Sequence, residues 1–300
     1  MILILSNNQE ITTNEVIKWL QEMNKKFIRV HENEVFEIKV NEKRIYLQSP
    51  RNTFYIDEIT SIWYRRGGLR FSRLHYNNPS VNSHMDETQY WLEDYVIKML
   101  ESKKHINKQS NNHINKLLVL EHAKKAGLNI PEYYLAENTD QVIVEQTITK
   151  SIAENIILQS IDGLSESILY TAVVQGKERK NFFITFFQEK IEKDFEVRAF
   201  YLNGKIWSTA IFSQNDKKTE IDLRKYNLEK PNRNIRYNLP KEIEEKTHVL
   251  MQTLDLNCGS IDFIKSGNNF YFLEVNPVGQ FLGLSSICNY SLEKEIANYL

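Results

Sequence analysis

The sequence has few cysteines and no long apolar run. Only Cys258 and Cys288 are present among 300 residues, so a disulfide framework is excluded and no metal-ligand spacing occurs; we expect two reduced structural thiols. No stretch approaches the roughly 18 apolar residues that cross a bilayer. The start, Met1–Ser6, has no basic segment before its apolar run and predicts a buried strand instead of a signal peptide. We therefore expect a cytoplasmic protein without a membrane partner.

An excess of charge of either sign is also missing. The formal net charge is −1, which gives no general attraction to nucleic acid or to anionic lipid, so we expect no nucleic-acid partner. Any anionic ligand must then be bound by a local group of side chains. The sequence shows no internal repeat, and it shows no Ser-His-Asp or Cys-His arrangement that would indicate a protein nucleophile.

The composition that is present is typical of a globular protein with several lobes. Apolar residues make up 41% and charged residues 26%, and 300 residues suffice for two or three lobes that each bury a core. The polar segment 105–112 is rich in Asn, Lys and Ser, which is typical of an exposed connection. We therefore place an N-terminal α/β lobe at residues 1–105.

Hydrophobic periodicity and turn residues predict the elements. Helices are expected at 14–24, 85–103 with Ser83 as N-cap and an apolar face from Trp91 to Leu100, 113–126, 152–159 and 241–254. Strands are expected at 2–5, 27–30, 35–40, 44–47, 61–66, 142–144, 146–149, 168–175 and 182–187, the last buried on both faces. Two hairpins are expected, one through Asn203-Gly204 and one joining 260–265 to 270–276.

The second hairpin carries oxygen ligands in a pattern that points to chemistry. Because strand side chains alternate, Glu274 and Asn276 project from one face, and Asp262 on the partner strand can reach the same side. Both acids lie within apolar runs, where a carboxylate without a cation would be costly. Two carboxylates and an amide oxygen suit Mg²⁺, which is usually held by one or two carboxylates plus substrate phosphates. The alternative is an ordinary solvated face of a strand.

At these residues the sequence resembles the ATP-grasp superfamily. In that family an Asp on one strand and a Glu-x-Asn on the next hold two Mg²⁺ ions against the ATP phosphates, and Asp262, Glu274 and Asn276 match the pattern. The resemblance implies an ATP-grasp fold with a pre-ATP-grasp domain at 1–105, a central lobe at 106–187 and a C-terminal lobe at 188–300. ATP would bind between the last two.

The same resemblance extends to the segments that would bind ATP. Gln188, Glu189, Lys190 and Ile191 follow a predicted buried strand and resemble the linker that holds the adenine. Lys116 and Lys150 match the two lysines that neutralise the phosphates.

Arg198, in Glu196-Val-Arg198, matches the acid-x-Arg element that follows the linker in related ligases, and Arg224 lies in the segment before the last predicted helix. Guanidinium groups can bind a γ-phosphate or a substrate carboxylate, so we expect both to be catalytic. For each arginine the alternative is a surface ion pair, and for each lysine it is a solvated surface residue.

The run from Phe187 to Leu300, with Trp63–Arg66 near the front, resembles the peptide maturases that make graspetides, closest to the grasp-with-spasm subgroup. The resemblance implies a macrocyclase that acts on a ribosomal precursor peptide with a leader and a core. ATP would phosphorylate an Asp or Glu side chain, and a Thr or Ser hydroxyl or a Lys amine would then form an ester or amide. It also implies a homodimer and a leader-binding surface within about 150–210.

Three alternatives stay open from the sequence. The ATP site would equally serve a RimK-like ligase that adds a free amino acid to a peptide or small molecule. A non-catalytic nucleotide- or peptide-binding module is a further alternative. Arg65 and Arg66 either face the ATP or peptide site or simply end a strand at the surface.

Overall fold

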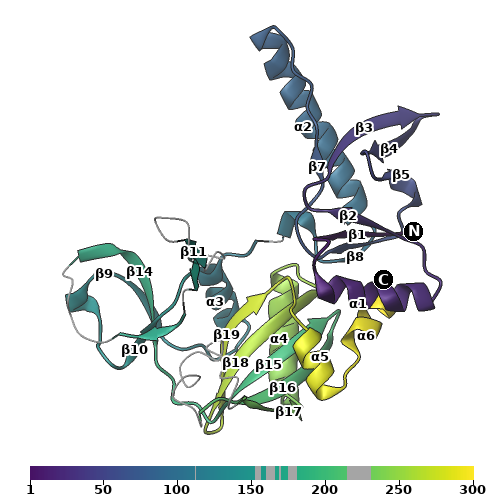
Figure 1. Cartoon of the computed structure of the whole chain (residues 1–300). Helices are drawn as coiled ribbons and strands as arrows, with labels where there is room; N and C mark the ends of the chain where they lie inside the picture. Colours follow the sequence, from purple (N-terminus) through teal and green to yellow (C-terminus); the bar gives the residue numbers. More distant parts are fainter. Residues whose placement is uncertain (112, 153–156, 160–165, 169, 175–180, 215–230) are drawn as a thin grey trace. The chain divides into compact units, whose positions relative to one another are not determined.

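The chain forms two compact units. The computed structural model describes residues 1–111, 113–152, 157–159, 166–168, 170–174, 181–214 and 231–300. Unit 1 comprises residues 1–113, 255–259 and 277–300, and unit 2 comprises 114–254 and 260–276 (Figure 1). The predicted division into three lobes at 105 and 187 stays a prediction. In the described part of the chain, no helix is long and apolar enough to span a membrane.

Unit 1 is built on a parallel sheet in the order β2-β1-β6-β8. Its strands are β1 (Ile2–Ser6), β2 (Phe27–His31), β6 (Ser61–Tyr64) and β8 (Lys104–Ile106). All five residues of β1 are buried, as expected for a strand inside a parallel sheet covered on both faces. Helices α1 (Ile11–Glu22), α5 (Leu282–Cys288) and α6 (Leu292–Tyr299) belong to the same unit, and α1 packs against α6.

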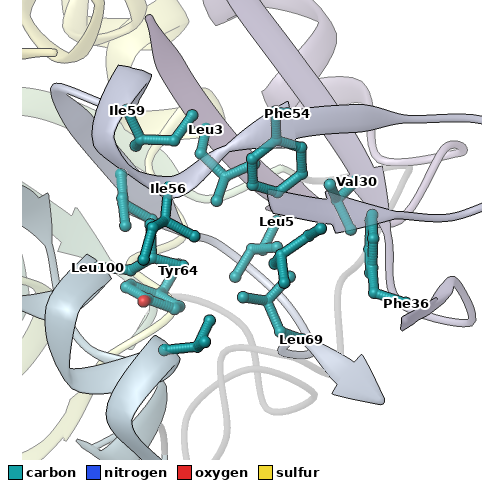
Figure 2. Packing of buried hydrophobic residues seen from close by; sticks show 13 residues of the cluster. Leu3, Leu5, Val30, Phe36, Phe54, Ile56, Ile59, Tyr64, Leu69 and Leu100 are labelled. Atoms are coloured by element: carbon teal, nitrogen blue, oxygen red, sulfur yellow. The ribbon is translucent and has the colours of Figure 1, made fainter. Parts of the chain in front are cut away.

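A second sheet of unit 1 has the order β5-β4-β3-β7. Its strands are β3 (Val35–Asn41), β4 (Arg44–Gln48), β5 (Thr53–Tyr55) and β7 (Arg70–Phe71). Apolar side chains from both sheets form one core, which Figure 2 shows from close by; it includes Leu3, Leu5, Val30, Phe36, Phe54, Ile59, Tyr64, Leu69 and Leu100. This core accounts for the α/β character that the sequence predicts for the N-terminal lobe.

Helix α2 (Pro79–Glu101) begins earlier than predicted. The N-cap is Asn78, whose side chain accepts hydrogen bonds from the backbone N–H of Ser80 and Val81, and Pro79 occupies the first helical position. The predicted apolar face was wrong for its first half. Val96 and Leu100 are buried, but the first three residues of the predicted face are exposed; they are Trp91, Leu92 and Tyr95.

The first part of unit 2 holds a sheet in the order β13-β10-β14-β9. Its strands are β9 (Tyr133–Asn138), β10 (Thr147–Thr149), β13 (Ala172–Val173) and β14 (Asn181–Glu189), and a separate pair joins β11 (Ile157–Gln159) to β12 (Glu166–Ile168). The prediction that 182–187 is buried on both faces was wrong. A register shift against β9 separates the pairs at Asn181 and Thr185, and between them Phe183 is 88% exposed.

The second part of unit 2 is a sheet in the order β17-β16-β15-β18-β19. Its strands are β15 (Phe195–Leu202), β16 (Lys205–Phe212), β17 (Arg233–Tyr237), β18 (Cys258–Ser266) and β19 (Asn269–Asn276), with helices α3 (Lys116–Lys125) and α4 (Lys241–Thr253). Both predicted hairpins are confirmed. Asn203 and Gly204 both have positive φ, 45° and 89°, which is the backbone that an Asn-Gly hairpin turn requires.

Three element predictions in the central region differ from the structure. A short 3-10 helix at Thr139–Gln141 precedes residues 142–144, which form no strand. The last residues of the predicted helix 152–159 are strand β11, and 153–156 lie outside the described residues. Described residues of the predicted strand 168–175 belong to two strands, β12 and β13. Polar composition and short elements left little periodicity to read here.

Candidate functional site

The hairpin β18–β19 places two acids directly opposite each other. Asp262 pairs with Glu274, and Ser260 pairs with Asn276, in one antiparallel register. Directly opposed residues, and residues two apart, project from the same face of such a pair, so the side chains of Asp262, Glu274 and Asn276 share one face. The register shifts immediately after Asp262, and a bulge at this position is typical of strands that present side chains to a site.

Two cations meet these carboxylates in the described structure. Arg198 on β15 binds Asp262 with two hydrogen bonds, Nε to Oδ1 at 2.8 Å and a terminal guanidinium nitrogen to Oδ2 at 2.9 Å. Lys116, the first residue of α3, lies with its Nζ 3.5 Å from Oε2 of Glu274. Basic groups therefore surround the acidic face, and an anion such as a phosphate would find both charge and donors here.

A third carboxylate, Glu196, lies two residues before Arg198 on β15; the sequence motif includes it, but we predicted no site role for it. Its side chain is bound by Lys193 and accepts a hydrogen bond of 3.2 Å from Ser213. Burial raises the pKa of Glu196, and Lys193 opposes that shift. The charge of Asp262 is the main cause that raises the pKa of Arg198. The alternation Glu196-Val-Arg198 within a buried strand was the available signal.

The donor set fits a hard divalent cation. Asp262, Glu274 and Asn276 offer oxygen atoms only, which suits Mg²⁺ better than a softer metal. Among the described residues, no three side chains of His, Cys, Asp or Glu are grouped to hold a metal by themselves. Mg²⁺ retains water and takes phosphate oxygens, so two carboxylates and an amide suffice for it.

A pocket next to these residues is lined by the predicted adenine linker. Its walls come from residues 188–193, which include the end of β14, from Gln214, and from the apolar residues Pro131, Ile148, Ile264 and Leu273. All four linker residues line it: Gln188, Glu189, Lys190 and Ile191. Apolar walls with a few polar groups are typical of a site for a flat heteroaromatic ring. The sequence analysis missed Pro131, Ile264 and Leu273 because they come from separate segments.

Gln188 is fully buried, and its side-chain amide is unsatisfied. Among the described residues, neither its Nε2 nor its Oε1 has a hydrogen-bond partner. A buried polar group in this state costs about 1–3 kcal/mol relative to a satisfied one. A bound molecule with one donor and one acceptor would relieve that cost, and the amino group and ring nitrogen of adenine are such a pair.

The remaining predicted residues are placed as follows. Lys150 comes directly after β10, with its Nζ 6.0 Å from the centre of the Phe186 ring, and it lies two residues beyond Ile148, which lines the pocket. Arg224 lies outside the described residues. The site roles predicted for both, and for the other site residues, stay predictions.

In unit 1, Arg65 and Arg66 differ sharply. Arg65 is 2% exposed and pairs with Glu10, whose Oε1 lies 2.7 Å from its Nε, whereas Arg66 is exposed. Burial alone would raise the pKa of Glu10, but the hydrogen bond and charge of Arg65, followed by Thr13 and Arg66, lower it. Cys258 and Cys288 are buried and form no disulfide within the described part of the chain, and burial raises the pKa of Cys258 to about 12, as expected for structural thiols.

Solved structures with a similar fold cover nearly the whole chain. The macrocyclase MdnC from Microcystis aeruginosa MRC, bound with precursor peptide MdnA, is 24% identical with a TM-score of 0.76, over 100% of this chain and 99% of that one. The Chryseobacterium gregarium RiPP-associated ATP-grasp ligase, in complex with ADP and a leader and core peptide, is 21% identical with a TM-score of 0.76, over 99% and 94%.

A third structure is the ATP-grasp ligase PsnB complexed with a minimal precursor, Mg and ADP, at 14% identity and a TM-score of 0.66, over 99% of this chain and 96% of that one. The chain has the ATP-grasp fold. No protein-family model matches the sequence, and no curated protein matches it at significant similarity. The predicted fold is therefore confirmed by three-dimensional likeness.

Proposed function

We propose that this ATP-grasp chain is an ATP-dependent macrocyclase that acts on a ribosomally made precursor peptide. The observation that carries the proposal is the likeness in fold, over at least 99% of this chain, to a macrocyclase bound with a precursor peptide and to a ligase bound with ADP and a leader and core peptide. The sequence motifs of graspetide maturases point independently to the same activity. An ADP-forming ligase of carboxylates with alcohols or amines is the corresponding enzyme class.

The adenine of ATP would occupy the pocket lined by residues 188–191, with the orphan amide of Gln188 turning towards it. Lys116 and Lys150 would neutralise the phosphates, with the N-terminus of α3 adding its own positive end. Asp262, Glu274 and Asn276 would hold Mg²⁺, with two ions expected. When bound, the ions offset the repulsion between the triphosphate and the substrate carboxylate.

The proposed reaction has two steps. An oxygen of an Asp or Glu side chain of the peptide takes the γ-phosphoryl group, and ADP leaves. A Thr or Ser hydroxyl or a Lys amine then attacks the acyl carbon, the phosphate leaves with that oxygen, and the nucleophile loses its proton. Arg198 would orient the anionic groups, as a bidentate guanidinium does for a carboxylate or phosphate. Arg224 is proposed to share this role.

The peptide would need a surface of its own in the central region. Within the proposed leader-binding range 150–210, β14 leaves Phe183 88% and Ile184 52% exposed. Large exposed apolar side chains on a strand are typical of a binding surface. We propose that these two residues contact the leader.

We further propose that the chain acts as a homodimer in the bacterial cytoplasm. Exposed aromatic residues on α2 support the dimer. Two buried cysteine thiols, which form no disulfide in the described structure, are typical of a reducing compartment. Light scattering coupled to size exclusion would measure the dimer, and a monomer mass at micromolar concentration would contradict it.

Mass spectrometry of a cognate precursor after incubation with Mg·ATP tests the activity. The peptide is expected to lose the mass of one water for each ring, with ADP and phosphate released in equal amounts. A gain of an amino-acid residue mass would instead assign a ligase that adds free amino acids. An unchanged peptide with no ADP formed would contradict both.

A further inference from the structure

Asn107 ties together the two ends of the metal-binding hairpin. It is 2% exposed and follows β8 with a positive φ of 54°. Its Oδ1 accepts hydrogen bonds from the backbone N–H of Asn257 at 3.2 Å and of Cys258 at 3.1 Å. Its Nδ2 donates to the carbonyls of Cys258 at 3.1 Å and of Pro277 at 2.7 Å. One amide side chain therefore binds the first residue of β18, the residue before it, and the residue that follows β19.

The hydrogen bonds of Asn107 take the place of strand-to-strand hydrogen bonds at the open end of the hairpin. Ser260 pairs with Asn276 at this end of the ladder. Cys258 lies two residues before that pair and Pro277 one residue after it, and a proline cannot donate a ladder hydrogen bond. Asn107 supplies both donors and acceptors at this position, so the strand spacing is set by a side chain that is distant in the sequence.

Arg65 binds the next residues of the returning chain. Its guanidinium donates to the carbonyls of Val278 and Gly279, the latter at 3.1 Å. The same group is fixed by its ion pair with Glu10. Its carbon Cζ lies 5.8 Å from the centre of the Phe281 ring, so the guanidinium group has both polar and aromatic contacts. Such a group has little freedom to move.

We propose that Asn107 and Arg65 are positioning residues, which hold the ends of the β18–β19 hairpin and so fix the spacing of the oxygen ligands Asp262, Glu274 and Asn276. The inference rests on the proposed function, since it assigns these residues to its metal site. The hydrogen bonds given above for both residues go to backbone groups at the ends of the hairpin and to Glu10, so both would act through the backbone. Mg²⁺ demands near-octahedral oxygen geometry, so a small change in the spacing of the strands weakens its binding.

The test is Asn107→Gly, with Asn24→Gly as matched control. Glycine accepts the left-handed backbone, so Asn107→Gly removes the side-chain contacts without adding backbone strain. Asn24 has the same φ of 54° in the same unit but is exposed. ADP binding is measured by calorimetry, once in EDTA and then over a series of Mg²⁺ concentrations.

In Asn107→Gly the Mg²⁺ concentration for half-maximal enhancement of ADP binding is expected to rise about 10-fold or more, as for residues that orient metal ligands. ADP binding in EDTA stays within about twofold, because the adenine pocket does not involve this residue. Asn24→Gly matches the wild type in both. A folded Asn107→Gly variant with the Mg²⁺ dependence of the control would overturn the assignment of Asn107.

Arg65→Lys is the second variant and decides the case where Asn107→Gly does not fold. Lysine keeps the charge opposite Glu10 but loses the planar fork that reaches two carbonyls. A rise in the Mg²⁺ requirement with unchanged binding in EDTA is expected, and an unchanged requirement overturns the proposal. If the wild type itself shows no Mg²⁺-dependent ADP binding, the proposed function fails. If the wild type shows it and both variants have the same Mg²⁺ requirement as Asn24→Gly, this inference alone fails.

Discussion

Arg198 and Asp262 form a bidentate ion pair, in which the guanidinium group donates hydrogen bonds of 2.8 and 2.9 Å to the two carboxylate oxygens. The acid that sequence alone assigns to Mg²⁺ is therefore already neutralised by a neighbouring strand. A carboxylate has about four lone-pair positions, so this pair leaves room for a metal ion on the same group. The pair also makes Asp262 differ from Glu274, whose carboxylate lies 3.5 Å from the Nζ of Lys116.

Asp262→Asn and Glu274→Gln are expected to abolish ATP turnover equally but to differ in stability. Each removes a negative Mg²⁺ ligand, so ADP formation should fall at least about 100-fold. Asp262→Asn also leaves Arg198 without its carboxylate, which costs about 1.5–3 kcal/mol for hydrogen bonds to a charged group. Urea unfolding, read by circular dichroism, measures the difference.

The double variant Asp262→Asn with Arg198→Leu supplies the check. Removing both partners should recover most of the stability lost in Asp262→Asn, because no unpaired charge remains. Equal stability of Asp262→Asn and Glu274→Gln would contradict a folding role for the pair. Turnover retained in both single variants would contradict the metal assignment.

Glu10→Gln is expected to change how stability depends on pH. The pKa of Glu10 is lowered from 4.5, so the stability that the charged form contributes is present above that value and is lost as the pH falls below it. In Glu10→Gln this contribution is absent and Arg65 is unpaired, at a cost of about 3 kcal/mol at pH 7. Unfolding free energies from pH 7 to pH 3 should therefore converge as the solution becomes acidic. A difference in unfolding free energy between the wild type and Glu10→Gln that stays constant from pH 7 to pH 3 would contradict the lowered pKa of Glu10.

Ile184→Ser and Phe183→Ser are expected to weaken precursor binding without affecting ATP. Both side chains are exposed on β14, so stability should change by less than about 0.5 kcal/mol. Removing an apolar contact of this size should weaken peptide binding about 10-fold or more, measured by fluorescence anisotropy of a labelled leader. Ile287→Ser is the matched control, since Ile287 is 57% exposed against 52% for Ile184. Equal peptide binding in all three variants would exclude β14 from the leader surface.

The sequence predicts the C-terminal sheet well because its signals are local. Asn203-Gly204 requires a hairpin turn, and alternation along 270–276 assigns Glu274 and Asn276 to one face, as the register shows. The likeness of these motifs to the ATP-grasp superfamily supplied the fold, which the comparison of structures confirmed.

Features set by distant segments were not predictable in the same way. The burial of Arg65 depends on Glu10 and on the chain after Asn276, and no periodicity connects these segments. The exposure of Phe183 depends on a register shift against β9, although its apolar neighbours suggest a buried strand. The prediction of an apolar face on α2 was wrong in its first half for a related reason: the helix extends beyond the core that buries Val96 and Leu100.

Gln188→Leu is expected to weaken ATP binding while stabilising the nucleotide-free protein. Both amide atoms are buried and unpaired, so a leucine of similar size removes a cost of about 1–3 kcal/mol and the melting temperature should rise. The same change removes the proposed bonds to adenine, so the rise in melting temperature caused by saturating ADP should shrink. The melting temperature of the nucleotide-free protein should therefore rise, while the further rise caused by ADP should become smaller. Differential scanning fluorimetry measures both.

Gln109→Leu is the control because the Gln109 amide is paired. Its Oε1 accepts from the backbone N–H of Leu69 at 2.8 Å and its Nε2 donates to the carbonyl of the same residue at 3.3 Å. Its replacement should lower the melting temperature and leave the ADP-induced shift unchanged. If Gln188→Leu behaved as Gln109→Leu does, the buried amide would be a structural group with an internal partner, and adenine recognition would have to come from the backbone of residues 189–191 alone.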